Sequence, residues 1–218
     1  MTSETTPEST SADHLPENEA SGVSDAPTRK RPKPGERRLQ ILQTLAGMLE
    51  QPGAERITTA ALSAKLGVSE AALYRHFASK AQMFEGLIDF VEQSVFAFVR
   101  QSADREPAGP AQVGRMVALI LQFAEKNPGM ARVMTGDALV FENERLQERM
   151  NLLFDKLESS FKQSLRDGGS QSDTPTVDAQ VTASLLIAFM MGRMQRFARS
   201  GFKRLPSENL QASLARIL

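Results

Sequence analysis

The chain has 218 residues, and its 26 basic and 26 acidic side chains give a formal net charge of zero. It contains no cysteine, which excludes disulfides, thiolate zinc sites and a cysteine nucleophile and suits a reducing compartment. Its two histidines, His14 and His76, leave little for an imidazole metal site. The N-terminus lacks a basic start followed by an apolar run, so we expect no secretory signal and a cytoplasmic protein.

The charges are segregated along the chain. Residues 1–28 carry six acids and no base, residues 29–80 carry ten bases and four acids, and residues 81–218 carry sixteen of each. A basic block of this kind is the electrostatic footprint of a nucleic-acid-binding segment.

Residues 1–28 have hardly a large apolar side chain, which predicts disorder. Pro32 and Pro34 then keep the basic stretch extended. We therefore predict a disordered acidic tail and basic arm over residues 1–35. The acidic tail could compete with DNA for the arm, and the arm itself either enters a minor groove or is a solvated charge run.

From Glu36 the apolar residues follow helical spacing up to the "QPG" at 51–53, which predicts a helix. Two short helices follow. Thr58 or Thr59 caps the first, Gly67 ends it in the left-handed conformation, and Ser69 caps the second. With Leu73 and Phe77 turned inward, the pattern predicts a helix-turn-helix within a domain of residues 36–80.

The outer face of the second short helix suits a DNA groove. Small residues let its backbone approach bases, where Ser69 can form hydrogen bonds and alanine methyls can touch thymine methyls. Tyr74, His76 and Lys80 are placed to hold phosphates, and Arg75 could contact base or backbone. The predicted DNA-binding residues are Thr58, Thr59, Ser69, Glu70, Ala71, Ala72, Tyr74, Arg75, His76 and Lys80. The alternative is an ordinary helical hairpin with a polar outer face.

The rest of the chain, residues 81–218, predicts more helices and no strands, so the expected fold is all-α. We expect helices from Lys80 to about Arg100, from Ala111 to Asn127, from Asp137 to Arg166 and from Val177 to about Ser200, and a short one from Ser207. A short segment, "MARVMTG", joins the second and third, and an exposed loop at 167–176 joins the third and fourth.

The stretch "TTAALSAKLGVSEAALYRHFASKAQMF" resembles the DNA-binding domain of the TetR family of regulators. The resemblance implies that the helix after the turn reads bases. It also implies phosphate contacts from Tyr74, His76 and Lys80, with Phe77 in the core. A TetR-like fold would add a C-terminal domain whose last two long helices form a four-helix dimer interface.

Longer stretches, among them "NPGMARVMTGDALVFENERLQERMNLLF" and "QRFARSGFKRLP", resemble one branch of that family, the nucleoid occlusion factors. This resemblance implies a homodimer on palindromic double-stranded DNA that blocks assembly of the tubulin-like division protein FtsZ. It implies an FtsZ-tail groove at Phe90, Leu119, Lys126 and Asn127, although Phe90 and Leu119 also fit a plain apolar core. The predicted location is then the cytoplasm, in association with the nucleoid.

Residues 181–200 are apolar on more than one face and too short to span a membrane, and they contain Arg193. We expect a core face and a two-fold dimer face there, with Ala188 and Gly192 allowing close approach of helices.

No phosphate loop, metal-ligand spacing or catalytic constellation is present, so we expect no enzyme activity and no cofactor. The predicted function is DNA-dependent inhibition of FtsZ ring assembly over the nucleoid. The alternatives are a ligand-responsive TetR-type repressor, with methionines lining an inducer cavity, and a purely architectural DNA protein.

Overall fold

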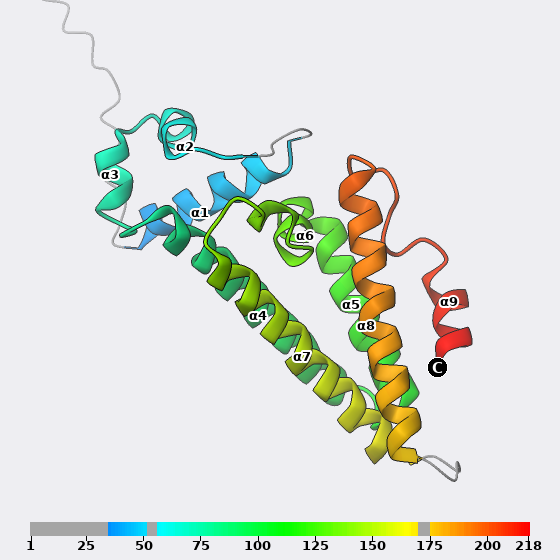
Figure 1. Ribbon diagram of the computed structural model, residues 1–218. Helices are drawn as coiled ribbons and strands as arrows, with labels where there is room; N and C mark the ends of the chain where they lie inside the picture. The colour runs from blue at the N-terminus through cyan, green and yellow to red at the C-terminus, as the bar shows by residue number, and fades with distance from the viewer. Residues whose placement is uncertain (1–34, 52–55, 170–174) are drawn as a thin grey trace, which may run out of the picture. The chain divides into compact units, whose positions relative to one another are not determined.

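The computed structural model describes residues 35–51, 56–169 and 175–218, which belong to one compact unit (Figure 1). The predicted acidic tail and basic arm, up to residue 34, lie outside these described residues. The regular elements in them are helices: α1 (Glu36–Leu49), α2 (Thr59–Leu66), α3 (Glu70–Tyr74), α4 (Lys80–Ala103), α5 (Pro110–Lys126), α6 (Pro128–Met134), the 3-10 helix η1 (Asp137–Leu139), α7 (Glu144–Asp167), α8 (Pro175–Arg199) and α9 (Leu210–Ile217). The all-α prediction is confirmed.

Helices α1–α3 form the part that we call the reading head. Ile41, Leu45 and Leu49 bury one stripe of α1, and Leu62 and Leu73 are buried on α2 and α3. Two short helices cannot enclose a core by themselves, so α1 supplies the missing apolar surface. The apolar face of the predicted helix-turn-helix is therefore used internally, and its polar face stays outside.

Helices α4–α9 form the part that we call the body. Helices α4 and α7 lie side by side, α7 packs against α8, and α5 contacts α4, α7 and α8 (Figure 1). Buried methionines fill gaps in this core, as flexible thioether side chains commonly do: Met116, Met130, Met134, Met150, Met190 and Met194. Met191, the neighbour of Met190, lies on the exposed side of α8 instead.

The long helix predicted from Asp137 to Arg166 is wrong in its opening residues. Gly136, at φ 77°, starts a 3-10 turn, and residues 140–143 are irregular before α7 begins at Glu144. The Asn143 side chain caps α7 by accepting a hydrogen bond from the Arg145 N–H at 3.1 Å. Asn is one of the preferred N-cap residues. It therefore starts a new helix at a point where the apolar spacing predicted one continuous helix.

Several other boundaries differ from prediction. Helix α4 continues to Ala103, α8 begins at Pro175 within the loop expected at 167–176, and α9 begins at Leu210. Helix α5 begins one residue earlier, at Pro110, because proline suits a first helical position whose N–H has no partner. The "MARVMTG" segment falls largely within a helix of its own, α6.

Helix α6 joins the body to the reading head by close backbone contact. A Cβ on Gly129 would stand 2.3 Å from the Ala46 carbonyl oxygen, so only glycine allows this approach of α6 to α1. The buried Arg132 donates from Nη1 to the Leu49 carbonyl at 3.2 Å and from Nε to Asp137 at 2.6 Å. Arg132 thereby satisfies a carbonyl at the end of α1 that the helix leaves without a partner.

Candidate nucleic-acid interface and peptide groove

Three hydroxyl caps start helices α2, α3 and α4, and the first two were predicted. The Thr58 side chain accepts from the Ala61 N–H at 3.1 Å, and the Ser69 side chain accepts from the Ala72 N–H at 3.3 Å. Ser79 caps α4 in the same way, which was not predicted. Gly67, at φ 65°, ends α2 in the left-handed conformation as predicted. Each capping hydroxyl keeps its own proton, so Thr58 and Ser69 can still donate outward.

The structure brings most predicted DNA-binding residues to one surface at α3. Leu73 and Phe77 are buried, while Ser69, Glu70, Ala71, Tyr74, Arg75 and His76 are exposed and Ala72 is half-buried. Thr59, on α2, donates its hydroxyl proton to the Glu70 carboxylate at 2.5 Å, which ties the two short helices together. That carboxylate is therefore partly engaged within the head.

Helix α1 supports the end of α3 through Arg38. Its Nη1 donates to the His76 carbonyl at 3.0 Å, and its guanidinium lies 4.1 Å from the centre of the Phe77 ring. A delocalised guanidinium suits both contacts at once. Arg38 thus positions the chain that carries Arg75 and His76, a role that the sequence pattern did not indicate.

Lys80 differs from the other predicted DNA-binding residues because it already has a carboxylate partner. Its Nζ forms an ion pair with Glu142, from the irregular segment before α7, and lies 5.6 Å from the centre of the Phe84 ring. The side chain of Glu142 is only 9% exposed. A phosphate contact by Lys80 would compete with this pair.

A ladder of ion pairs continues along the α4–α7 contact. Arg145 pairs with Glu85, and Arg149 pairs with both Asp89 and Glu92, each at 2.5 Å. Burial alone would lower the pKa of Arg149, but hydrogen bonds and charge from Asp89 and Glu92 outweigh it and raise that pKa. These pairs hold α4, the helix that directly follows the reading head, to α7 within the body.

An apolar groove of about 300 Å³ lies between α1, α4 and the start of α6. Its lining is Leu39, Leu42, Gln43, Ala46, Glu50, Gly86, Leu87, Phe90, Asn127 and Met130. Gly86 keeps the groove narrow at its base, since a Cβ there would meet the Leu42 side chain at 3.0 Å. The contribution of α1 was not predicted, because Leu39 and Leu42 belong to a helical stripe that is typical of a core.

Of the four residues predicted to bind a partner peptide, two line this groove and two lie near it. Phe90 is 49% exposed, so it is not plain core, and it lines the groove with Asn127. The Phe90 ring lies 5.8 Å from that of Phe123, which lies one turn beyond Leu119 on α5. Leu119 is half-buried and Lys126 is exposed, and neither lines the groove.

Asn127 is held in place rather than free. Its Nδ2 donates to the Phe123 carbonyl at 2.8 Å, at the end of α5. The amide oxygen is not used in that contact and is available to accept from a ligand.

The predicted dimer residues lie on an exposed stripe of α8. Ala188 and Gly192 are exposed, and a Cβ on Gly192 would meet no atom within 4 Å. Val177, Val181 and Leu185 continue the stripe at helical spacing and are each more than half exposed. A row of large apolar side chains in water is typical of a surface that another protein covers.

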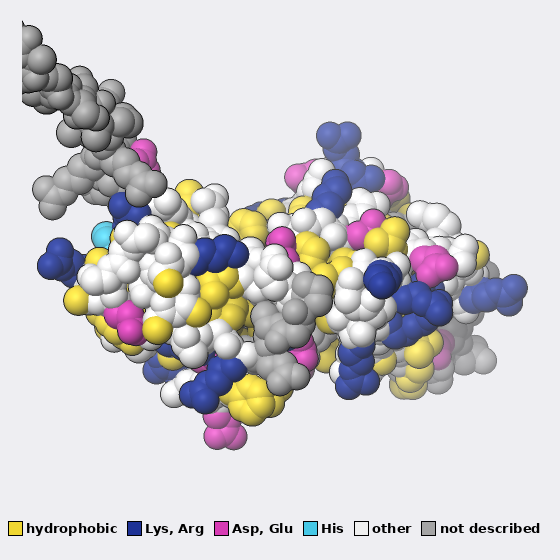
Figure 2. Space-filling view, turned by 90° about the horizontal axis from the view of Figure 1, so that it is seen from above, with side chains coloured by type: hydrophobic (Ala, Val, Ile, Leu, Met, Phe, Trp, Pro, Cys, Tyr) yellow, Lys and Arg dark blue, Asp and Glu magenta, His cyan; other side chains and the backbone are white. Residues whose placement is uncertain are grey.

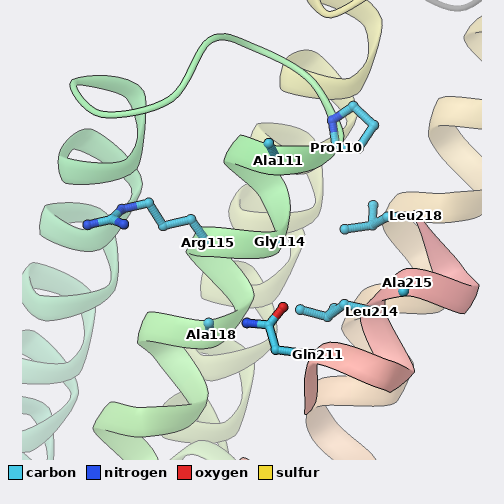
Figure 3. Close-up of a pocket in the computed structure, with 9 residues that line it drawn as sticks. All are labelled: Pro110, Ala111, Gly114, Arg115, Ala118, Gln211, Leu214, Ala215 and Leu218. Atoms are coloured by element: carbon cyan, nitrogen blue, oxygen red, sulfur yellow. The ribbon is translucent and has the colours of Figure 1, made fainter.

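A second hollow, of about 430 Å³, lies between α5 and α9 (Figure 3). Gly114, Ala118, Leu214 and Leu218 face it, whereas the Arg115 side chain points away toward α4. Of the described residues, no cluster of His, Asp or Glu could hold a metal ion, and no helix is long and apolar enough to cross a membrane.

Two family descriptions match the chain. Residues 41–87 match the bacterial regulatory proteins of the tetR family, and residues 109–217 match the tetracyclin repressor-like C-terminal domain of the SlmA-like type. Together they span the reading head and most of the body.

Curated relatives match at high identity over most of both chains. The nucleoid occlusion factor SlmA of Idiomarina loihiensis is 51% identical over 177 residues, which cover 81% of this chain and 90% of that protein. The SlmA of Vibrio cholerae is 48% identical over 79% of this chain and 89% of its own length. That of Alteromonas mediterranea is 47% identical over 82% of this chain and 92% of its own length.

Solved structures of lower identity share the fold. The TetR-family regulator PfmR from Thermus thermophilus has a TM-score of 0.63 at 21% identity, and covers 82% of this chain and 97% of its own. FadR from Bacillus subtilis, solved with stearoyl-CoA, has a TM-score of 0.61 at 12% identity, and covers 82% and 96%. These likenesses establish the arrangement of helices alone.

Proposed function

This chain belongs to the TetR family and, within it, to the SlmA nucleoid occlusion factors. From that premise we propose which part of the chain binds DNA and which part dimerises and binds FtsZ. Residues 36–80 read palindromic chromosomal DNA as one half of a homodimer. Residues 81–218 dimerise and bind FtsZ. Bound to the chromosome in the cytoplasm, the dimer inhibits FtsZ ring assembly and so blocks division over the nucleoid.

The α3 surface suits the major groove. Its small residues, Ala71 and Ala72, leave room for close approach, and Ser69 offers a hydroxyl proton near base edges. Tyr74, Arg75 and His76 are exposed at the far end of the helix, where the DNA backbone would pass. We assign base reading to the first half of this surface and phosphate contact to the second.

The observation that carries the FtsZ proposal is the apolar groove beside the reading head, with the half-exposed Phe90 in its wall. An extended peptide could place an apolar side chain against Phe90 and bond its backbone to the Asn127 amide. Lys126, exposed one residue away, would favour an acidic peptide such as the C-terminal tail of FtsZ.

The same groove connects the two activities. Its walls come from α1 of the reading head and from α4 and α6 of the body. If DNA fixes the angle between head and body, it also fixes the width of the groove. Linkage then requires that the FtsZ tail strengthen DNA binding by the factor with which DNA strengthens tail binding.

We would test this with a labelled FtsZ C-terminal tail peptide, titrated with the full chain with and without a cognate duplex. We expect saturable binding that DNA strengthens. Phe90→Ala should weaken it about tenfold, since an aromatic side chain that a bound partner buries in the middle of an interface can contribute more than about 1 kcal/mol. Asn127→Asp should abolish it, because a carboxylate there would repel an acidic tail.

Val140→Ala is the matched control, since Val140 is exposed but lies outside the groove. Equal affinity of wild type and Phe90→Ala would remove the groove from the proposal. Absence of tail binding in both DNA states would leave a DNA-binding repressor of the TetR type.

A further inference from the structure

The segment from residue 179 to 207 carries five basic side chains and no acid. Arg193 is engaged within the chain, since it donates to the Glu208 carbonyl at 2.7 Å and to the Ser213 hydroxyl at 2.9 Å. The other four are exposed, and within the described residues none of them forms an ion pair: Arg196, Arg199, Lys203 and Arg204. We call these four the basic ledge.

The ledge is built on a tightly held turn. The Ser200 hydroxyl oxygen accepts from the backbone N–H groups of Lys203 at 3.1 Å and Arg204 at 2.9 Å. The bulky Phe202 adopts the left-handed conformation, at φ 65°, and its ring lies 5.1 Å from that of Phe197. A non-glycine residue in that region is strained and persists only where its surroundings hold it. The backbone that presents Lys203 and Arg204 is therefore fixed.

The ledge lies at the end of the body nearest the reading head. Just after it, Ser207 donates from its hydroxyl at 2.5 Å and from its N–H at 3.3 Å to Glu125, near the end of α5. The chain continues from α5 into α6, which packs on α1. In Figure 1 the C-terminal end of α8 lies at the same end of the molecule as α1 and α2. Figure 2, which views that end, shows Lys and Arg side chains over both the reading head and the body.

The position of the ledge on α8 relates it to the dimer. Arg199 follows Gly192 by seven residues and Ala188 by eleven, spacings that return to one face of a helix. If α8 forms the two-fold interface, the ledges of two protomers meet beside the two-fold axis, between the two reading heads. Clustered cations repel one another, so the pair of ledges is best stabilised by a polyanion that spans the axis.

We propose that the basic ledge binds the phosphate backbone of DNA between the two half-sites of the palindrome, as a contact separate from the helix-turn-helix. This inference rests on the DNA binding and the dimer proposed above. The ledge adds affinity without reading sequence, because phosphates carry no base identity. It would hold the body close to the DNA while the reading heads occupy their grooves.

The test measures the affinity of the full chain for a palindromic duplex, selected from a random library by the protein itself, across a range of salt concentrations. Lys203→Gln/Arg204→Gln should weaken binding at low salt and lower the slope of log affinity against log salt by about 1 for each phosphate that the protein no longer neutralises. Both protomers of the dimer carry the change, so we expect a fall of about 2 to 4. The ratio of specific to random-sequence affinity should stay unchanged.

Arg105→Gln/Arg166→Gln is the matched control, with the same charge change on two exposed residues, one just after the end of α4 and one on the last turn of α7. It should leave the slope unaltered. Phosphate ethylation at the centre of the duplex should weaken the wild type and have no further effect on the Lys203/Arg204 variant. Because both changed residues follow the end of α8, sedimentation should find the variant dimeric.

Three results would count against these proposals: one would defeat the proposed function, and two would overturn the ledge. Failure of the wild type to bind any selected duplex would defeat the proposed function itself. Normal wild-type binding with an identical salt slope in the Lys203/Arg204 variant would overturn the ledge alone. Unchanged DNA binding of that variant, with its binding to phosphatidylglycerol vesicles abolished, would also overturn the ledge and would assign it to a lipid surface.

Discussion

At the scale of single residues, the Lys80 ammonium has two possible partners, the Glu142 carboxylate and a DNA phosphate. In the free protein its ammonium pairs with Glu142, whose side chain is nearly buried. A phosphate placed beside Tyr74 and His76 would draw the same ammonium toward DNA. DNA binding through Lys80 would therefore have to break the Lys80–Glu142 ion pair, and the free energy of breaking it weakens DNA binding.

Glu142→Gln tests this competition. The amide has no charge to hold Lys80, so we expect DNA affinity at low salt to rise about threefold to tenfold, as for the release of one partly screened ion pair. Lys80→Gln should weaken DNA binding instead, and should also lower stability because it leaves the Glu142 carboxylate unpaired. Anisotropy titration of both variants measures the effect. No change in either would mean that Lys80 contributes no phosphate contact.

Local chemistry explains which residues the sequence could predict. Caps at Thr58 and Ser69 and the left-handed Gly67 depend on neighbours a few residues away, so the pattern alone was sufficient. The Lys80–Glu142 pair joins residues 62 positions apart, and no periodicity reports such a contact. The predicted helix from Asp137 to Arg166 included Glu142, but α7 begins two residues later, at Glu144.

At the scale of elements, the joint between α1 and α6 decides how the reading head is held. The helices touch at Gly129, where a methyl group would overlap the Ala46 carbonyl. The apolar stripe of α1 was predicted, but Leu39 and Leu42 on one side of it line the groove and are not buried in the core. Leu39 is 57% exposed, and only the tertiary position of α4 shows why. Binary patterning identifies an apolar face without naming what covers it.

Gly129→Ala should therefore destabilise the protein by about 1–3 kcal/mol, the usual cost of forcing extra volume into a packed contact. Gly47→Ala is the matched control on α1, since a Cβ there meets no atom within 4 Å. That change should stabilise by about 0.5–1 kcal/mol through helix propensity. Urea unfolding of both variants gives the comparison. Equal midpoints for Gly129→Ala and wild type would show that α1 and α6 can separate without cost.

At the scale of the whole molecule, the exposed stripe on α8 supports the proposal that two chains form the working unit. The sequence indicated this from the small residues Ala188 and Gly192, and the structure adds the large apolar neighbours Val177, Val181 and Leu185. A single reading head contacts one half-site, whereas a palindrome needs two heads held about one DNA turn apart. Dimerisation through α8 would meet that requirement and would bring both FtsZ-tail grooves to one DNA site.

Gly192→Glu tests this arrangement, because a side chain at this position meets no atom of its own chain but would meet the partner chain in a dimer. The substitution should leave helix content unchanged, since no atom within 4 Å opposes a side chain there. In a dimer it would bury two like charges beside the two-fold axis, which is strongly unfavourable. We expect sedimentation to show a monomer and palindrome affinity to fall toward that of a half-site. Ala97→Glu, on the exposed face of α4, makes the same charge change away from the stripe and should remain dimeric. A dimeric Gly192→Glu protein with full DNA affinity would place the two-fold interface elsewhere, and with it the meeting of the two basic ledges.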